Sequence, residues 1–182
     1  MRQLTENLIR LYSAKDIRSR ICDMGEEISN RYRNKNPIFI GVLNGSFIFL
    51  SDLVRVIDLD CELDFVKVRS YNGKKSSGRI ELLQDISLEV KNRDIILVED
   101  IIDTGLTIKY LREKVNGDKP KSIAIATLLH KPRIEKIGFP IDFIGFDIPH
   151  EFVVGYGLDY NQKMRHLNGI YYIPSDHNNQ RQ

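Results

Sequence analysis

The residues with the clearest chemical potential form one continuous stretch, Val98-Glu99-Asp100-Ile101-Ile102-Asp103-Thr104-Gly105-Leu106-Thr107. Glu99, Asp100 and Asp103 place three carboxylates within five positions, directly after an expected apolar strand and directly before an expected helix. Neighbouring carboxylates repel each other, and a divalent cation or hydroxyl donors would relieve that repulsion. The turn at 104–107 offers two hydroxyls, a glycine and the free N–H groups of a helix start, which together can hold a phosphate. Carboxylates beside a phosphate cradle suit a phosphorylated pentose.

The same stretch has a simpler interpretation, in which the acids only cap the helix and interact with its dipole. Two familiar phosphate motifs are absent from the sequence. There is no G-x-x-x-x-G-K-[ST] loop of nucleoside-triphosphate enzymes and no G-x-G-x-x-G dinucleotide fingerprint. The function therefore depends on what surrounds the acidic stretch.

The elements that must position these groups show two alternating hydrophobic patterns, helical spacing and short apolar runs. Helical spacing is expected over 17–28 and 47–57 and from about 104 to 115, and Ser13 is a plausible N-cap for the first helix. Short apolar runs predict strands at 38–43, 61–71, 95–98, 123–129 and 141–146. This alternation predicts an α/β fold with a mostly parallel sheet that has helices on both faces. Ligands of such sheets bind beyond the carboxyl ends of the strands, where the acidic stretch lies.

Composition narrows the class of protein further. The chain has 182 residues, 27 Lys and Arg against 25 Asp and Glu, and a formal charge of +2. This near-neutral balance argues against a nucleic-acid binder. Cys22 and Cys61 stand apart without ligand-like neighbours, which disfavours a disulfide scaffold or a zinc site. No apolar run suits a signal peptide or a membrane span, so we expect one cytoplasmic domain over 1–182 with no membrane partner.

The stretch 98–107 resembles the signature of type I phosphoribosyltransferases, which bind 5-phosphoribosyl 1-pyrophosphate through this loop. Further segments resemble the 6-oxopurine branch of that family, the hypoxanthine (hypoxanthine-guanine) phosphoribosyltransferases, and they occur in the same order. These segments are Leu43-Asn44-Gly45-Ser46, Ser70-Tyr71, Leu128-Leu129-His130-Lys131 and Phe152-Val153-Val154-Gly155-Tyr156-Gly157-Leu158-Asp159-Tyr160-Asn161. The resemblance covers the chain from about residue 43 to residue 168 and implies the type I phosphoribosyltransferase fold.

For the sugar, the resemblance implies that Glu99 and Asp100 bind the ribose hydroxyls with Mg²⁺ nearby. Residues 103–107 would hold the 5′-phosphate, and Asp103 would also accept a proton from the purine as the catalytic base. Positioned proton acceptors of this kind typically contribute about 10²–10⁴-fold to a rate.

For the pyrophosphate, the resemblance implies backbone donation from Leu43, Asn44 and Gly45, in many relatives through a non-proline cis peptide, and a second contact from Arg165. Asn44 departs from the family, where a basic residue is common at this position, so the charge or intersubunit contact of that side chain is in question. As alternatives, Asn-Gly is also a good strand-to-helix turn, and a lone arginine is usually a solvated surface charge.

For the purine, the resemblance implies that Lys131 donates to the exocyclic O6, that Phe152 stacks on the ring and that the Val153 backbone meets its Watson–Crick edge. Asp159 would lie near the 2-position and help to hold a second Mg²⁺, which makes Glu99, Asp100 and Asp159 the expected metal carboxylates. Taken alone, the apolar segment at 152–154 could equally be a core strand, and the lysine an ordinary residue at a strand end.

The polar segment that begins at Ser70 and Tyr71 and runs to about residue 79 resembles the mobile loop that closes over the reaction. A solvated hairpin loop would have the same composition. We also expect a small hood lobe over the carboxyl edge of the sheet, built from the N-terminal segment and the region after about residue 150, with the residues after Tyr71 as a further contributor. By resemblance, the protein is expected to form a homodimer or homotetramer.

The sequence therefore favours an enzyme that transfers the phosphoribosyl group from phosphoribosyl pyrophosphate to a 6-oxopurine base, with Mg²⁺ as cofactor. A second hypothesis is a regulator of the same fold that senses phosphoribosyl pyrophosphate. Such a regulator could dispense with Asp103 and Lys131, both of which this chain keeps. A third hypothesis, a plain nucleotide-binding protein whose acids hold only Mg²⁺, leaves Lys131 and the segment 152–161 unexplained.

Overall fold

The computed structural model of the chain describes residues 8–70, 80–132 and 138–174. Its three helices are α2 (Ala14–Arg31), α3 (Phe47–Val54) and α4 (Leu106–Gly117) within these ranges. Its strands are β1 (Ile9–Tyr12), β2 (Ile38–Leu43), β3 (Glu62–Ser70), β4 (Ile80–Gln84), β5 (Asp94–Ile102), β6 (Ser122–His130), β7 (Phe143–Asp147), β8 (Val153–Val154) and β9 (Ile170–Tyr172). Apart from Ser70 at the end of β3, the predicted mobile loop at 70–79 lies outside the described residues.

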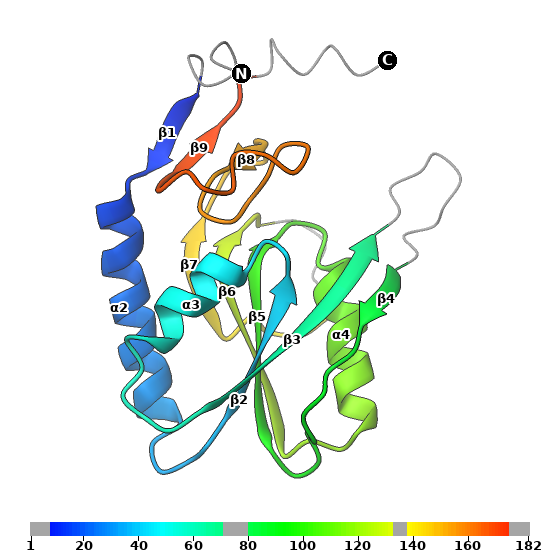
Figure 1. Cartoon of the computed structure of the whole chain (residues 1–182). Coiled ribbons are helices and arrows are strands. Elements are labelled where there is room, and N and C mark those ends of the chain that lie inside the picture. The colour runs from blue at the N-terminus through cyan, green and yellow to red at the C-terminus, as the bar shows by residue number, and fades with distance from the viewer. Residues whose placement is uncertain (1–7, 71–79, 133–137, 175–182) are drawn as a thin grey trace.

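The larger sheet has the strand order β4-β3-β2-β5-β6-β7. Strands β3, β2, β5, β6 and β7 pair in parallel, and only the edge strand β4 runs antiparallel to its neighbour β3. Helices α2 and α3 cover one face, while α4 covers the other (Figure 1). The predicted fold class is therefore confirmed. No helix in the described ranges is both long enough and apolar enough to cross a membrane.

Helix α2 shows how the sequence sets these elements. Ser13 caps it: its hydroxyl accepts a hydrogen bond from the Asp16 backbone N–H at 3.2 Å, and the Asp16 carboxylate accepts one from the Ser13 N–H at 2.9 Å. This reciprocal pair satisfies N–H groups that the first turn leaves open. The predicted apolar positions at 17, 21, 24 and 28 are all buried, so the periodic face packs against the sheet.

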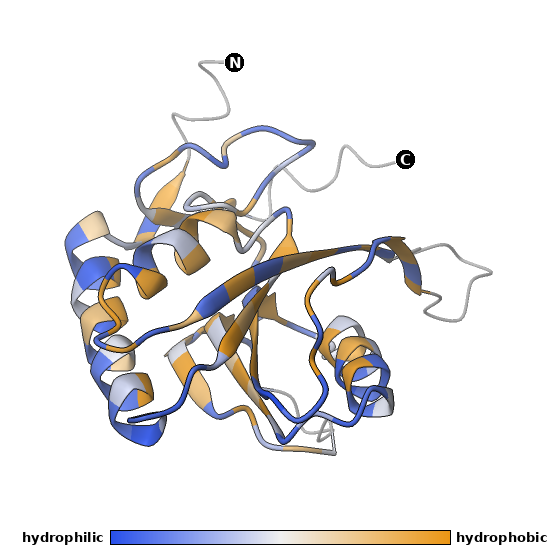
Figure 2. Ribbon diagram, turned by 60° about the horizontal axis from the view of Figure 1, so that its bottom comes forward, coloured by the Kyte–Doolittle hydropathy of each residue, from blue (hydrophilic) through white to orange (hydrophobic). Residues whose placement is uncertain are grey.

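Two cores lie on the two faces of the larger sheet. The first packs α2 and α3 against alternate residues of the central strands, and the second packs α4 against the residues between them. The central strands are accordingly hydrophobic over most of their length, whereas α2 and α4 are largely hydrophilic on their outer sides (Figure 2). A sheet covered in this way holds the carboxyl ends of its strands rigidly, and the predicted site lies at those ends.

A second, three-stranded sheet with the order β1-β9-β8 stands above this edge (Figure 1). Its strands come from the N-terminal segment and from the region after residue 150, the segments from which we expect the hood, and this sheet is called the hood below. The expected contribution from residues after Tyr71 is wrong for Ile80–Gln84, which form β4 and extend the larger sheet instead. These residues pair with the open edge of β3, which satisfies its backbone groups.

Candidate active site

The acidic pair lies inside β5 and not directly after it, which corrects the sequence prediction. The strand continues to Ile102 because β6 pairs with it throughout, including Glu99 with Thr127 and Ile102 with His130. Glu99 is buried, with 7% of its surface exposed. Burial, together with the charge of Asp100, raises the pKa of the Glu99 carboxyl well above its ordinary value.

Asp100 is half-buried and faces the loop after β2. Burial raises the pKa of its carboxyl to about 6, while hydrogen bonds from the backbone of Asp100 and Ile101 and the positive charge of Arg165 act in the opposite direction. The negative charge of Asp159 adds to the rise, so the hood acts electrostatically on this carboxylate. Asp100 is thus a carboxylate whose charge the protein only partly compensates, which is the condition under which a cation or hydroxyl donors bind.

The predicted pyrophosphate loop follows β2 and reaches Asp100. Gly41 of β2 pairs with Val98 of β5, so the residues that follow each of them end side by side. The Leu43–Asn44 peptide bond is cis. A Cβ atom on Gly45 would stand 1.8 Å from Oδ2 of Asp100, so only glycine leaves room for the carboxylate. The structure therefore brings this loop and Asp100 together.

Asp103 and Lys131 also meet, from the ends of neighbouring strands. The pairing of Ile102 with His130 places the next residue of each strand side by side, and the Lys131 N–H donates to the Ile102 carbonyl at 2.9 Å. Lys131 Nζ lies 3.4 Å from Oδ2 of Asp103. Lys131 is buried, with 8% exposed, whereas the Asp103 carboxylate remains accessible. A buried ammonium group and a carboxylate are thus available at one point of the sheet edge.

The predicted phosphate cradle lies at the start of α4. Gly105 is the N-cap residue with a left-handed φ of 73°, and it has no side chain that could cap the helix. The Leu106 N–H donates to Thr104 Oγ1 at 3.4 Å, and the other N–H groups of the first turn have no intrahelical acceptor. Thr104 is exposed and Thr107 is half-buried beside them, while Leu106 has 48% of its surface exposed. Helix starts of this kind bind anions because their N–H groups and dipole face outward.

The hood contributes a second set of groups. Arg165 pairs with Asp159 at 2.8 Å and donates to the Gly157 carbonyl at 2.7 Å, so its guanidinium group is partly used in holding the hood loop. Phe152 is half-buried and meets Tyr160 edge to face at 6.0 Å between ring centroids. Val153 is buried in β8, so the interpretation of 153–154 as a core strand is confirmed, and the contact of its backbone with a purine stays a prediction.

Whether the site can hold Mg²⁺ depends on which side chains can act as its ligands. Within the described residues, no three His, Cys, Asp or Glu side chains come together as a metal site. Glu99, Asp100 and Asp159 therefore do not form a closed cage. Mg²⁺ does not require one, because it usually takes one or two carboxylates and completes its shell with water and substrate phosphates. The partly compensated Asp100 fits that use.

Sequence reasoning gave no role to the residues that bring the hood to the pyrophosphate loop. A Cβ atom on Gly157 would stand 2.1 Å from the carbonyl oxygen of Gly45, so the two loops touch through their backbones. Tyr156 precedes that contact and binds Asp52 of α3. The Gly-Tyr-Gly sequence was an available signal, since two glycines around an aromatic residue suggest unusual backbone angles, but its partner could not be read from the sequence.

An acidic strand end, an open helix start and a hood above them, on a mostly parallel sheet, are the arrangement that we expect of a protein that handles a phosphorylated sugar. The phosphoribosyl transferase domain matches residues 10–161, and the chain belongs to that family.

Individual relatives agree with this family. The chain is 45% identical over 158 residues to a hypoxanthine-guanine phosphoribosyltransferase of Streptococcus pyogenes, covering 86% of this chain and 88% of that protein. It is 43% identical over 155 residues to the hypoxanthine phosphoribosyltransferase of Escherichia coli, covering 84% and 87%. A crystal structure of a hypoxanthine phosphoribosyltransferase from Staphylococcus aureus superimposes with a TM-score of 0.90 at 35% identity, covering 96% of each chain. The resemblance stated from the sequence is confirmed.

Proposed function

We propose that the protein transfers the 5-phosphoribosyl group from phosphoribosyl pyrophosphate to N9 of hypoxanthine and guanine, giving IMP or GMP and pyrophosphate. The observation that carries this proposal is the pairing of Lys131 with Asp103 at the sheet edge, beside the acidic strand and the open start of α4. A protein that only sensed the sugar would not need a buried ammonium group next to a carboxylate.

In the proposed reaction, N9 of the purine forms a bond to C1 of the ribose while the bond from C1 to the pyrophosphate oxygen breaks. The electron pair of that bond leaves with pyrophosphate, and the ring proton passes to the Asp103 carboxylate. A bound Mg²⁺ would neutralise the charge on the leaving group and would be held by Asp100 with substrate oxygens. Gly45 and its neighbours would donate backbone N–H groups to the pyrophosphate, and residues 104–107 would hold the 5′-phosphate.

Base selection would rest on Lys131. Its ammonium group is buried and can only donate, so it suits the O6 acceptor of hypoxanthine and guanine. The 6-amino group of adenine would face it with another donor and leave it unpaired, which excludes adenine strongly. Phe152 would stack on the ring, and Val153 and Asp159 would face its other edge.

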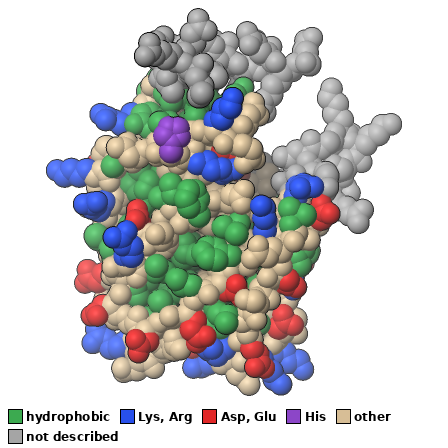
Figure 3. Space-filling view, viewed as in Figure 1, with side chains coloured by type: hydrophobic (Ala, Val, Ile, Leu, Met, Phe, Trp, Pro, Cys, Tyr) green, Lys and Arg blue, Asp and Glu red, His purple; other side chains and the backbone are tan. Residues whose placement is uncertain are grey.

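We also propose that the protein forms a homo-oligomer. Apolar side chains gather on the face around α3 and β3 (Figure 3), where Phe47, Val56 and Leu63 have 44%, 38% and 46% of their surfaces exposed. Light scattering of the purified protein should give the mass of a dimer or a tetramer, and a monomer at micromolar concentration would contradict this proposal.

The decisive experiment incubates the protein with phosphoribosyl pyrophosphate, Mg²⁺ and one purine base at a time, and separates the products by chromatography. We expect nucleotide from hypoxanthine and guanine and none from adenine. Asp103→Asn should lose most of the activity, whereas Asp118→Asn, the same change at the exposed C-cap of α4, should not. Binding of phosphoribosyl pyrophosphate without turnover of any base would contradict the proposal and favour a sensor.

A further inference from the structure

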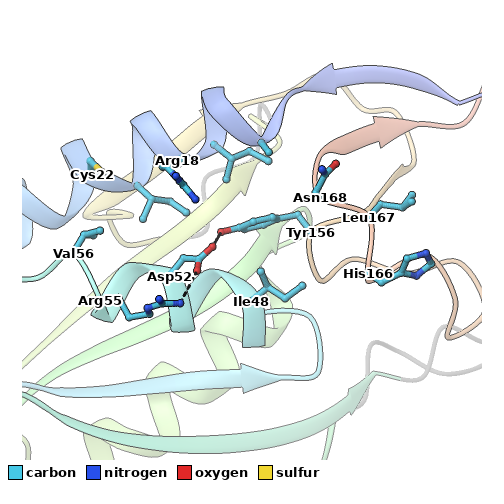
Figure 4. Close-up of a pocket in the computed structure, with 13 residues that line it drawn as sticks. Arg18, Cys22, Ile48, Asp52, Arg55, Val56, Tyr156, His166, Leu167 and Asn168 are labelled. Carbon is cyan, nitrogen blue, oxygen red and sulfur yellow. Dashed lines mark hydrogen bonds and ion pairs between the residues drawn. The ribbon is translucent and has the colours of Figure 1, made fainter.

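One hydrogen bond ties the hood directly to the body of the molecule. The Tyr156 hydroxyl donates to Oδ2 of Asp52 on α3 at 2.5 Å, across 104 positions of sequence. Only 7% of Tyr156 is exposed, and its ring extends from the hood loop towards the helix (Figure 4). Burial and the Asp52 charge both raise the pKa of the tyrosine hydroxyl, which therefore keeps its proton. A short bond from a hydroxyl to a carboxylate is among the stronger hydrogen bonds in proteins.

On the hood side, this bond fixes a backbone with unusual angles. Tyr156 has a φ of 50°, between Gly155 at 96° and Gly157 at 99°. The Tyr156 N–H donates to the Leu167 carbonyl at 2.8 Å, so ring and backbone are held independently. The next residue, Gly157, makes the close backbone contact with Gly45. The side chain of Tyr156 is thus anchored at the residue directly before the one through which the hood contacts the pyrophosphate loop.

On the other side, Asp52 belongs to the helix that this loop leads into. Helix α3 begins at Phe47, two residues after Gly45, and the intervening Ser46 is buried with its hydroxyl bonded to the Val42 carbonyl at 2.7 Å. A buried hydrogen bond therefore joins the start of α3 to the end of β2, on either side of the loop. Asp52 also lies 4.0 Å from Arg55, but that arginine is largely exposed, and exposed pairs of this kind contribute little.

We propose that Tyr156 and Asp52 are positioning residues, which set the distance between the hood and the pyrophosphate loop. This inference rests on the proposed function, because it takes the hood as the purine side of the site and the loop at 43–45 as the pyrophosphate side. When the hydrogen bond between the two residues is intact, the base held by Phe152 and Val153 lies at a fixed distance from the sugar. When it is cut, both the base and the pyrophosphate bind less well, while the 5′-phosphate cradle at 104–107 is unaffected.

The test compares Tyr156→Phe and Asp52→Ala with the wild type by steady-state kinetics. Each variant should raise the KM for hypoxanthine and the inhibition constant of pyrophosphate by about 10-fold, the size expected when a hydrogen bond to a charged group is lost. The inhibition constant of ribose 5-phosphate should stay unchanged. The double variant should be no worse than either single one, and Asp52→Asn, which keeps an acceptor, should retain most of the wild-type affinity. Tyr172→Phe in β9 and Arg55→Ala are the matched controls and should behave as wild type.

Three results would overturn the inference: constants unchanged in both single variants, losses that add in the double variant, or an equal loss of ribose 5-phosphate binding. The last would indicate a merely structural role. These constants do not depend on the fraction of protein that is folded, so a less stable variant still gives an answer. Failure of the proposed function is seen separately, because the wild type would then form no nucleotide.

Discussion

Replacement of Gly45 by alanine tests the geometry of the site most directly. The added Cβ would stand 1.8 Å from Oδ2, 2.3 Å from Cγ and 2.7 Å from Oδ1 of Asp100. Ordinary contacts between carbon and oxygen begin at about 3.3 Å, so either the carboxylate or the loop must withdraw by roughly 1.5 Å. The side chain of Asp100 is short and half-buried, which leaves it little room to turn away.

The expected loss follows from that displacement. Overpacking of this kind costs about 1–3 kcal/mol, and a misplacement of about 1 Å at a reacting centre can lower a rate by about 10²-fold. We therefore expect Gly45→Ala to lower kcat/KM for phosphoribosyl pyrophosphate by about 10²-fold and to weaken inhibition by pyrophosphate. Steady-state kinetics with saturating hypoxanthine, together with urea unfolding, measure the two effects separately.

The matched control is Gly117→Ala at the end of α4, where an added Cβ would meet no atom within 4 Å. It should keep wild-type kinetics and stabilise the protein by up to about 1 kcal/mol, since alanine is the better helix former. The reasoning is refuted if Gly45→Ala retains kcat/KM within twofold of the wild type. It is refuted equally if the substitution lowers stability alone.

Three further substitutions test single side chains. Asp103→Asn should lower kcat by about 10²-fold or more while phosphoribosyl pyrophosphate still binds, and near-normal turnover would remove its role as the proton acceptor. Lys131→Ala should weaken hypoxanthine and guanine far more than phosphoribosyl pyrophosphate, whereas an equal loss for both would contradict the O6 contact. Asp100→Asn tests a pH dependence. The folded protein raises the pKa of the Asp100 carboxyl from 3.8 to about 6, so the protonated carboxyl favours the folded state. This contribution to the free energy of unfolding is lost as the pH rises from about 4 to above 6. In EDTA at pH 7.5 the variant should be more stable than the wild type by up to about 3 kcal/mol, the gain should vanish below pH 4, and Asp118→Asn should show no such pattern.

The predictable parts of the fold are those whose buried residues form a regular hydrophobic pattern in the sequence. The apolar positions of α2 recur at helical spacing, and β2 and the first part of β5 are apolar throughout because both of their faces are covered. The sequence at 98–107 likewise predicted that Asp103 and the start of α4 would share one sheet edge. These features depend on local order alone.

Other features depend on partners that local order does not reveal. β4 is only five residues long, three of them exposed, so its few apolar side chains did not mark it as a strand of the larger sheet. It forms because β3 offers an open edge. Carboxylates suggest the end of a strand, yet β5 continues past Glu99 and Asp100 because it pairs with β6. The bond between Tyr156 and Asp52 joins segments more than one hundred positions apart, and no spacing rule could have connected them.

The arrangement of the hood has a consequence for biosynthesis. Its middle strand, β9, lies between β1 and β8, and β9 is the last of the described strands in chain order, whereas β1 is the first. Neither outer strand can find its neighbour until β9 has left the ribosome. The larger sheet, whose last strand is β7, is available earlier. A nascent chain would therefore complete the larger sheet first, and the carboxylates of β5 would stay exposed to water until the hood forms.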